Sequence, residues 1–419
     1  MAELQPELVD LVIKHITTAD NPLDEVTSTL LNSCLVSHTW RTIAQPMLFA
    51  EVPRRSPAKG LARFSDRLFG TLSRYEYLKG YITSLAVDVG DLAHLSRKRL
   101  FDLIPQIHEL VLVTRSSSSL NTDTGLVEMW ANINPSTRLT TICVTTVNKF
   151  PIDIFYYAAA LKRLHLIDVG FIGFSSTDGS PISNLSAQTQ RAKLSDLYLF
   201  SQLDKQDIRI LSWFLHPQCA FDFSELSTCH IIYTPFPPDT QPKPESHLLI
   251  ERFLQSLNTP VIRDIGFCPP RTLLKEEADF PRYQIFHNLP SLQSVKVALD
   301  EAVQSDQSLI QWVVSQFLPQ LSHPERLEEL LIPLSFGHDT SYNTSKASLG
   351  WDSLDTLLSS DFGPFLNLRR VHVAIHDPTR VTYPQDHLEM MQALKHTITQ
   401  LLPQLHERNI LRVTLSPCK

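Results

Sequence analysis

Glycine is scarce in this sequence: 12 glycines occur among 419 residues, well below the average usage of about 7%. Tight glycine-rich loops allow a backbone to approach a phosphate or to expose a serine nucleophile. The sequence contains no Gly-x-Gly-x-x-Gly, no Walker-type loop and no Gly-x-Ser-x-Gly. We therefore expect a protein that is not an enzyme and that needs no cofactor.

Closely spaced cysteines are also lacking. None of the cysteines forms a Cys-x-x-Cys pair, which argues against a zinc site or a redox motif. His372 and His376 lie four residues apart, but on a strand this spacing separates them by about 13 Å, too far to share a metal. No metal site is expected. The six cysteines are Cys34, Cys143, Cys219, Cys229, Cys268 and Cys418.

Long apolar runs and basic runs are absent as well. No stretch of about 18 apolar residues occurs, so no membrane span is expected, and residues 1–11 lack the features of a secretory signal. The formal charge is -7, whereas nucleic-acid binding needs clustered Lys and Arg. We expect an intracellular protein of the cytoplasm or nucleus, with reduced thiols and with neither a membrane nor a nucleic-acid partner.

The N-terminal region has the periodicity of three helices. Apolar residues recur at helical spacing between signals that begin or break a helix. Proline suits a first helical turn but breaks a helix further on, and Ser or Thr caps a helix N-terminus. The expected boundaries are Pro6 and Asn21-Pro22 for the first helix, Thr27 or Ser28 for the start of the second, and Ser37 and Pro46 for the third.

Segments of this region resemble the F-box motif, in the form common in fungal F-box proteins. The family pattern is roughly Leu-Pro-Pro-Glu-Leu, an Ile-rich helix, Leu-Val-Cys-x-x-Trp and a trailing Leu-Phe. Gln5 stands where the family usually has proline, and His38 lies near a usual Cys or Ser step. The matching segments are Leu4-Gln5-Pro6-Glu7-Leu8, Ile13 with Ile16, Cys34-Leu35-Val36-Ser37-His38-Thr39-Trp40-Arg41, and Met47-Leu48-Phe49.

This resemblance implies three small helices that bind a Skp-type adaptor, which links the protein to a cullin-RING ubiquitin ligase. Three such helices cannot bury all their apolar faces on one another, so an apolar patch should remain for the partner. The alternative is that the helices only cap the domain that follows. The residues expected to contact the adaptor are Leu4, Pro6, Leu8, Ile13, Ile16, Leu35, Val36 and Trp40.

From about residue 80 onward a six-residue pattern recurs: apolar-x-x-apolar-x-apolar. Its last two apolar positions alternate as in a strand with one buried face. Short helical stretches precede most copies, and the spacing allows a crossover between parallel strands. The copies are Ile82/Leu85/Val87, Ile107/Leu110/Leu112, Leu139/Ile142/Val144, Leu161/Leu164/Leu166, Leu194/Leu197/Leu199, Leu226/Cys229/Ile231, Ile262/Ile265/Phe267, Leu292/Val295/Val297, Leu327/Leu330/Ile332 and Leu368/Val371/Val373.

A strand and a helix per unit, with Leu-x-x-Leu-x-Leu, resemble the leucine-rich repeat. The resemblance implies an α/β fold in which an N-terminal helical F-box-like module precedes an irregular leucine-rich-repeat solenoid with a parallel sheet. An ordinary α/β domain with a parallel sheet is the alternative. Long polar connections at 114–125, 168–192, 234–246 and 337–350 are expected to be insertions at one rim. The expected domains are an F-box-like helical domain at 1–52, a helical linker or N-terminal cap at 53–80 and a leucine-rich-repeat-like domain at 81–419.

Residues between the buried strand positions should point away from the core, because strand side chains alternate. They mix both charges with an aromatic ring, which suits a protein partner better than a nucleic acid. We therefore expect the substrate receptor of a cullin-RING ligase, which holds a target protein on its repeats. The alternatives are an interaction scaffold unconnected to ubiquitin and an enzyme with an unrecognised site. Candidate target-binding residues are Arg163, His165, Asp196, Tyr198, Lys296, Arg370 and His372, with Tyr198 and Arg370 as preferred anchors.

Overall fold

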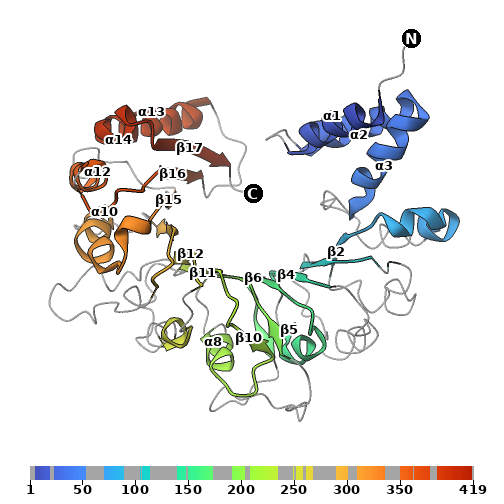
Figure 1. Ribbon diagram of the computed structural model, residues 1–419, viewed down its shortest axis with the longest axis horizontal. Coiled ribbons are helices and arrows are strands. Elements are labelled where there is room, and N and C mark those ends of the chain that lie inside the picture. Colours follow the sequence, from blue (N-terminus) through green and yellow to red (C-terminus); the bar gives the residue numbers. More distant parts are fainter. Residues whose placement is uncertain are drawn as a thin grey trace. The chain divides into compact units, whose positions relative to one another are not determined.

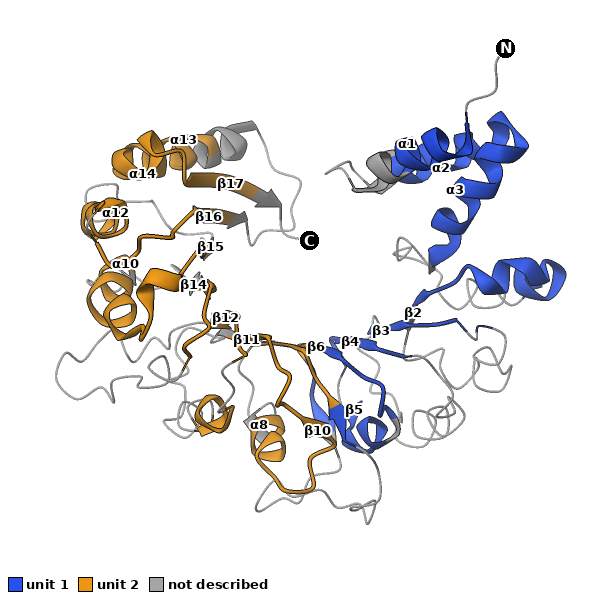
Figure 2. Ribbon diagram, viewed as in Figure 1, with its two compact units in different colours: residues 1–165, 169–174, 182–192 blue, residues 166–168, 175–181, 193–419 orange. Residues whose placement is uncertain are grey.

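The computed structural model divides into two compact units (Figure 2). Unit 1 comprises residues 1–165, 169–174 and 182–192, and unit 2 comprises residues 166–168, 175–181 and 193–419. Within them the structure describes residues 5–18, 23–52, 70–88, 104, 106–113, 139–147, 150–172, 191–202, 208–234, 249, 252–257, 261–267, 289–300, 309–335, 350–361, 363–377 and 385–417. Leu4 and most of the four long polar connections lie outside the described residues.

Three helices begin unit 1, as the sequence predicts: α1 (Pro6–Thr18), α2 (Leu23–Val36) and α3 (His38–Ala50). The predicted start of α2 is wrong, because the helix begins at Leu23 rather than at Thr27 or Ser28. The sequence places Asp24 and Glu25 in this first turn. Negative charge there interacts favourably with the helix dipole, which favours the earlier start.

The predicted end of the third helix is also wrong, because α3 continues through Pro46 to Ala50. A proline inside a helix removes one backbone hydrogen bond. Met47 and Leu48, which follow it, pack against the core of the helices, and this packing offsets the loss. The predicted cap at the other end is confirmed, since the Trp40 amide donates to Ser37 Oγ at 3.4 Å.

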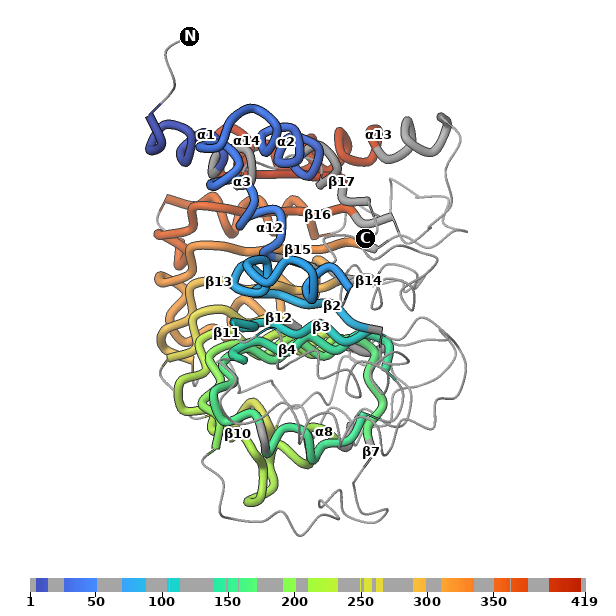
Figure 3. The backbone as a smooth tube through the Cα atoms, turned by 90° about the vertical axis from the view of Figure 1, so that its right-hand side faces the viewer, coloured from blue at the N-terminus to red at the C-terminus, as the bar shows by residue number. Residues whose placement is uncertain are grey.

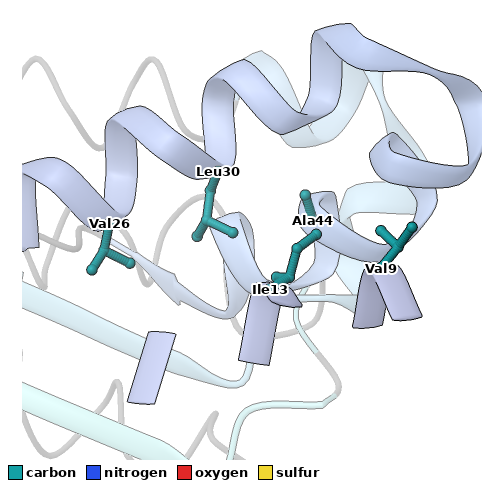
Figure 4. Packing of buried hydrophobic residues seen from close by; sticks show 5 residues of the cluster. All are labelled: Val9, Ile13, Val26, Leu30 and Ala44. Atoms are coloured by element: carbon teal, nitrogen blue, oxygen red, sulfur yellow. The ribbon is translucent and has the colours of Figure 1, made fainter. Parts of the chain in front are cut away.

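The helices enclose a small core of their own (Figure 4). Its members come from all three helices, and each is buried. Burying an aliphatic side chain of this kind stabilises a fold by about 1.5–3 kcal/mol. The core residues are Val9, Ile13, Val26, Leu30 and Ala44, with Cys34, Trp40, Ile43, Met47 and Leu48 partly buried against them.

Unit 1 continues with strands in the order β1-β2-β3-β4-β6, of which β1 to β4 pair in parallel. The boundary between the units falls within β6 (Arg163–Ile167). The other elements of this part are β1 (Glu51–Val52), the 3-10 helix η1 (Glu76–Gly80), β2 (Ser84–Asp88), β3 (Glu109–Val113), β4 (Thr141–Thr145), β5 (Phe150–Pro151), the 3-10 helix η3 (Ile152–Tyr157) and β7 (Phe171–Ile172).

Unit 2 has strands in the order β9-β11-β12-β13-β15-β16-β17, all parallel, with β14 beside β15 (Figure 3). Each unit is thus built on a parallel sheet with helices, which confirms the α/β class. The strands are β8 (Ala192–Lys193) at the unit boundary, β9 (Asp196–Gln202), β10 (Phe221–Asp222), β11 (Thr228–Thr234), β12 (Asp264–Phe267), β13 (Ser294–Val297), β14 (Leu299–Asp300), β15 (Glu329–Ser335), β16 (Arg370–Asp377) and β17 (Leu411–Pro417).

The helices of unit 2 connect these strands, and Figure 1 shows α10 and α12 on one side of β15 and β16. They are α8 (Ile208–Phe214), α10 (Leu309–Trp312), the π-helix η6 (Val313–Phe317), the 3-10 helices η7 (Leu318–Gln320) and η8 (Pro324–Arg326), α12 (Trp351–Ser359), α13 (Gln385–Leu401) and α14 (Pro403–Glu407).

All ten predicted strands are present, and every apolar position of the six-residue pattern whose side chain the structure describes is buried. Only the side chain of Phe267 lies outside that description. Adjacent copies pair in phase, so that Leu330 pairs with Val371 and Ile332 with Val373. The second apolar residues of successive copies also pair with one another along β9, β11, β12, β13 and β15. The buried residues therefore form continuous rows under each sheet.

A ladder of backbone hydrogen bonds fixes this phase at the start of the strands. In eight of the copies the carbonyl that follows the first apolar residue accepts two successive N–H groups of the next copy, at 2.8–3.1 Å. These bonds set the next copy in register between its first and second buried positions. The accepting residues are Thr83, His108 and Thr140 in unit 1, and Ser195, Ser227, Arg263, Gln293 and Glu328 in unit 2.

Of the strands longer than two residues, β17 was not predicted, although its signal is present. β17 follows Ile410, which begins a further copy of the pattern with Val413 and Leu415. Its register is offset by one pleat, because Val373 pairs with Val413 where the other copies would pair Val373 with Leu415. The turn before it is anchored by the buried Asp355, whose two carboxylate oxygens accept the Leu405 and Gln404 amides at 2.9 and 3.0 Å.

The alternation in β15 generates a matched pair of variants. Leu330→Ala should lower the free energy of unfolding by about 2–5 kcal/mol, because it leaves a cavity in the core. Leu331, its half-buried neighbour, points to the opposite face, so Leu331→Ala should cost less than about 1.5 kcal/mol. Urea denaturation of both variants measures the difference. Equal losses would contradict the assignment of the two faces.

Asp355 allows a second stability test. Asp355→Ala should lower the free energy of unfolding by about 1.5–3 kcal/mol, because two amides at the start of α14 lose a charged acceptor. Asp352, exposed on the same helix, is the control, and Asp352→Ala should cost at most about 1 kcal/mol. Thermal and urea denaturation give both values, and a smaller loss for Asp355→Ala would show that its hydrogen bonds do not hold this turn.

Candidate functional site

Exposed apolar side chains are concentrated on α1 and α2. These two helices have apolar residues on two sides: one side forms the core, and the other faces solvent. They carry six of the ten exposed large hydrophobic side chains in the part of the chain that the structure describes. We call this surface the α1–α2 apolar face. Its residues are Leu8, Leu11 and Val12 on α1, and Leu31, Leu35 and Val36 on α2.

The structure separates the predicted adaptor contacts into exposed and buried groups. Leu35, Val36 and Leu8 are 78%, 65% and 48% exposed, and Pro6 is also exposed. Ile13 is fully buried, so it supports the face from beneath and does not contribute contact area.

The remaining predicted contacts are less accessible or are not described. Trp40 is half-buried against the helical core. Leu4 and the side chain of Ile16 lie outside the described residues. Leu11, Val12 and Leu31 were not among the predicted contacts, although each lies at helical spacing from a predicted member of the face.

A second candidate surface is the side of the unit 2 sheet that faces away from the helices. The predicted alternation holds here, since Asp196, Tyr198, Lys296 and His372 are half-buried and Arg370 is exposed, while their sequence neighbours in the pattern are buried. In β6, Arg163 is exposed and His165 half-buried, and Arg163 Nε donates to Thr141 Oγ1 at 3.0 Å.

Several side chains on this side of unit 2 gather around Tyr198. Parallel pairing aligns Tyr198 on β9 with His230 on β11, Gly266 on β12 and Lys296 on β13. The rings of Tyr198 and His230 lie 5.8 Å apart. Lys296 Nζ lies 5.9 Å from the centre of the Tyr198 ring. His230 Nε2 lies 3.2 Å from Asp264 Oδ2. We use the name Tyr198 cluster for Tyr198, His230, Asp264, Gly266 and Lys296.

Gly266 is what allows this arrangement. The imidazole of His230 lies over it, and a Cβ at this position would come within 2.8 Å of His230 Cγ. Real Cβ atoms do not approach so closely, so any other residue would displace the ring. Lys296, on the far side of Gly266, can therefore extend across it toward Tyr198.

The Lys296 ammonium is held in partly desolvated surroundings. Burial lowers the pKa of Lys296, and the carboxylate of Asp264 only partly opposes this shift. No hydrogen bond or ion pair to Lys296 is formed by any residue that the structure describes. Its nearest interaction is the cation–π contact with Tyr198, which is worth about 0.5–1 kcal/mol at exposed sites.

Two other polar side chains on this side already have partners. Arg370, one of the two preferred anchors, donates to Glu329 at 3.2 Å, and His372 Nε2 lies 2.8 Å from Thr414 Oγ1. Cys229 is buried beneath the sheet, and burial, with the nearby carboxylates of Asp196 and Asp264, raises the pKa of its thiol far above the ordinary value. Of the two predicted anchors, Tyr198 lies beside an ammonium for which none of the described residues provides a hydrogen bond.

Among the described residues, no three His, Cys, Asp or Glu side chains are grouped as metal ligands. No described helix is both long and apolar enough to cross a bilayer. The chain matches no family model and no curated protein.

Proposed function

We propose that this protein is the substrate-recognition subunit of a cullin-RING ubiquitin ligase. The α1–α2 apolar face binds a Skp-type adaptor, and the sheet surface of unit 2 holds a target protein. The observation that carries the proposal is the concentration of exposed Leu and Val side chains on two short helices that already have a packed core.

The physical argument starts from the cost of leaving such side chains in water. Contiguous exposed apolar patches on soluble proteins usually mark an interaction site. The core beneath the face is complete without these six residues, so folding of the helices does not explain them. Burying each against a partner would stabilise a complex by up to about 1.5–3 kcal/mol. The resemblance of this region to the F-box motif names the partner.

For the remainder of the chain we propose an irregular leucine-rich-repeat solenoid. The recurrent buried pattern, the in-phase parallel pairing and the carbonyl ladder support it. Stacked units of this kind bury a common core and leave a second side of the sheet free for a partner. The protein would do no chemistry of its own and would act by holding a target near the ligase, which raises the effective concentration of the target lysine.

One observation favours the second candidate, a scaffold unconnected to ubiquitin whose helices cap the solenoid. α3 leads directly into β1, which pairs with β2, and the Thr83 amide donates to the Ala50 carbonyl at 2.9 Å. The helices thus do adjoin the first strands. Capping in this way uses the end of α3 and leaves the α1–α2 apolar face unexplained, so we place this candidate second.

Two substitutions on the face separate the candidates. Leu8→Glu together with Leu35→Glu should abolish binding to a purified Skp-type adaptor, because charged groups would have to be buried in the interface. Calorimetry and copurification measure binding, and circular dichroism confirms folding. Trp40 is avoided because its half-buried ring packs on the core.

Leu366→Glu is the matched control, since Leu366 is 59% exposed and lies in unit 2. It should bind the adaptor like the unaltered chain. Undiminished binding by the folded double variant, or no binding by the unaltered chain, would contradict the proposal.

A further inference from the structure

The chain's own Lys296 shows which kind of group the Tyr198 cluster can hold. Its ammonium extends across Gly266 to the face of an aromatic ring, and Asp264 attracts it. An aromatic face beside a carboxylate is the usual setting for a cationic side chain. The Lys296 ammonium therefore occupies a position whose aromatic ring and carboxylate suit a positively charged group.

The charge of the surroundings also favours a cation. Asp196 and Asp264 are aligned through Thr228 on the intervening strand β11. Burial, together with these two carboxylates, raises the pKa of Cys229 on the opposite side of that strand. Asp264 is the carboxylate that attracts Lys296, and it also lies 3.2 Å from His230 Nε2.

Lys296 itself is not the best occupant. Its ammonium is strongly hydrated in water, and burial here outweighs the attraction of Asp264. Its long aliphatic stem would let the charged end return to solvent. A guanidinium is more weakly hydrated, stacks on aromatic rings and pairs with carboxylates through a planar fork. Exchange would therefore favour both cations. The Lys296 ammonium would regain its hydration in solvent, and the guanidinium would gain the aromatic ring and the carboxylate.

We propose that the Tyr198 cluster binds an arginine side chain of the target protein, with Lys296 as a displaceable placeholder. The guanidinium stacks on Tyr198 and pairs with Asp264, and Lys296 moves into solvent. This inference rests on the proposed function only in identifying the arginine as part of a target protein. The arginine site itself depends only on the geometry of unit 2.

The test measures the fluorescence anisotropy of a labelled glycine-serine peptide that carries two arginines, with the full chain at low salt. Tyr198→Leu, which removes the ring without changing charge, should weaken binding about two- to fivefold. Asp264→Asn should weaken it about as much. Lys296→Met should tighten it about two- to fivefold, because the competing ammonium is gone.

Matched controls separate the site from the overall charge. Lys193→Met and Asp361→Asn make the same charge changes elsewhere on unit 2, at residues that pair with Glu225 and lie near Arg408, and both should leave the affinity unchanged. Effects equal to those of the cluster variants would overturn the proposal. So would the opposite signs, weaker binding for Lys296→Met and tighter binding for Asp264→Asn, which would indicate a site for acidic groups.

The peptide assay contains no adaptor, so the two proposals fail separately. If the unaltered chain does not bind the adaptor but does bind the arginine peptide, the ligase role alone is overturned. Normal adaptor binding, with a Tyr198→Leu variant that binds the peptide like the unaltered chain, overturns the arginine site alone.

Discussion

In most copies of the pattern one backbone carbonyl accepts two successive amides of the next copy, and the alignment of the paired strands depends on it. Because strand side chains alternate, a shift by a single residue would turn every buried residue to solvent. The double hydrogen bond fixes the register between the first and second buried positions of the next copy. The same constraint that aligns Leu330 with Val371 also aligns Tyr198, His230, Gly266 and Lys296 on the other side. Core and surface cluster are thus two consequences of one alignment.

Much of this fold was predictable from the sequence, because burial on one side of a strand leaves a pattern in the sequence itself. The period of two at positions such as Leu197 and Leu199 predicts both the strand and its buried face. Helix boundaries were less predictable, since packing overrides local signals. Pro46 lies within α3 because residues after it reach the core, a tertiary effect that no local signal contains. β17 carries the same pattern, but its register against β16 is offset by two residues, which the pattern itself does not encode.

The candidate sites were likewise predictable from the sequence only in part. The resemblance to the F-box motif selected Leu8, Leu35 and Val36, which are exposed, but it could not separate them from the buried Ile13. That distinction depends on how α1 packs against its neighbours. The alternation rule also placed Tyr198 and Lys296 on the free side of the sheet. It missed Asp264 and Gly266, whose roles follow from being adjacent in space to His230 and distant from it in sequence.

The central claim is that the outer side of α1 and α2 is an adaptor interface. Hydrogen exchange of the full chain with and without a purified Skp-type adaptor tests it most directly, because protection reports which amides a partner covers. The account predicts a complex in which new protection is concentrated in α1 and α2 and the strands of unit 2 exchange as before. New protection confined to the sheet of unit 2, or no change at saturating adaptor, would contradict it.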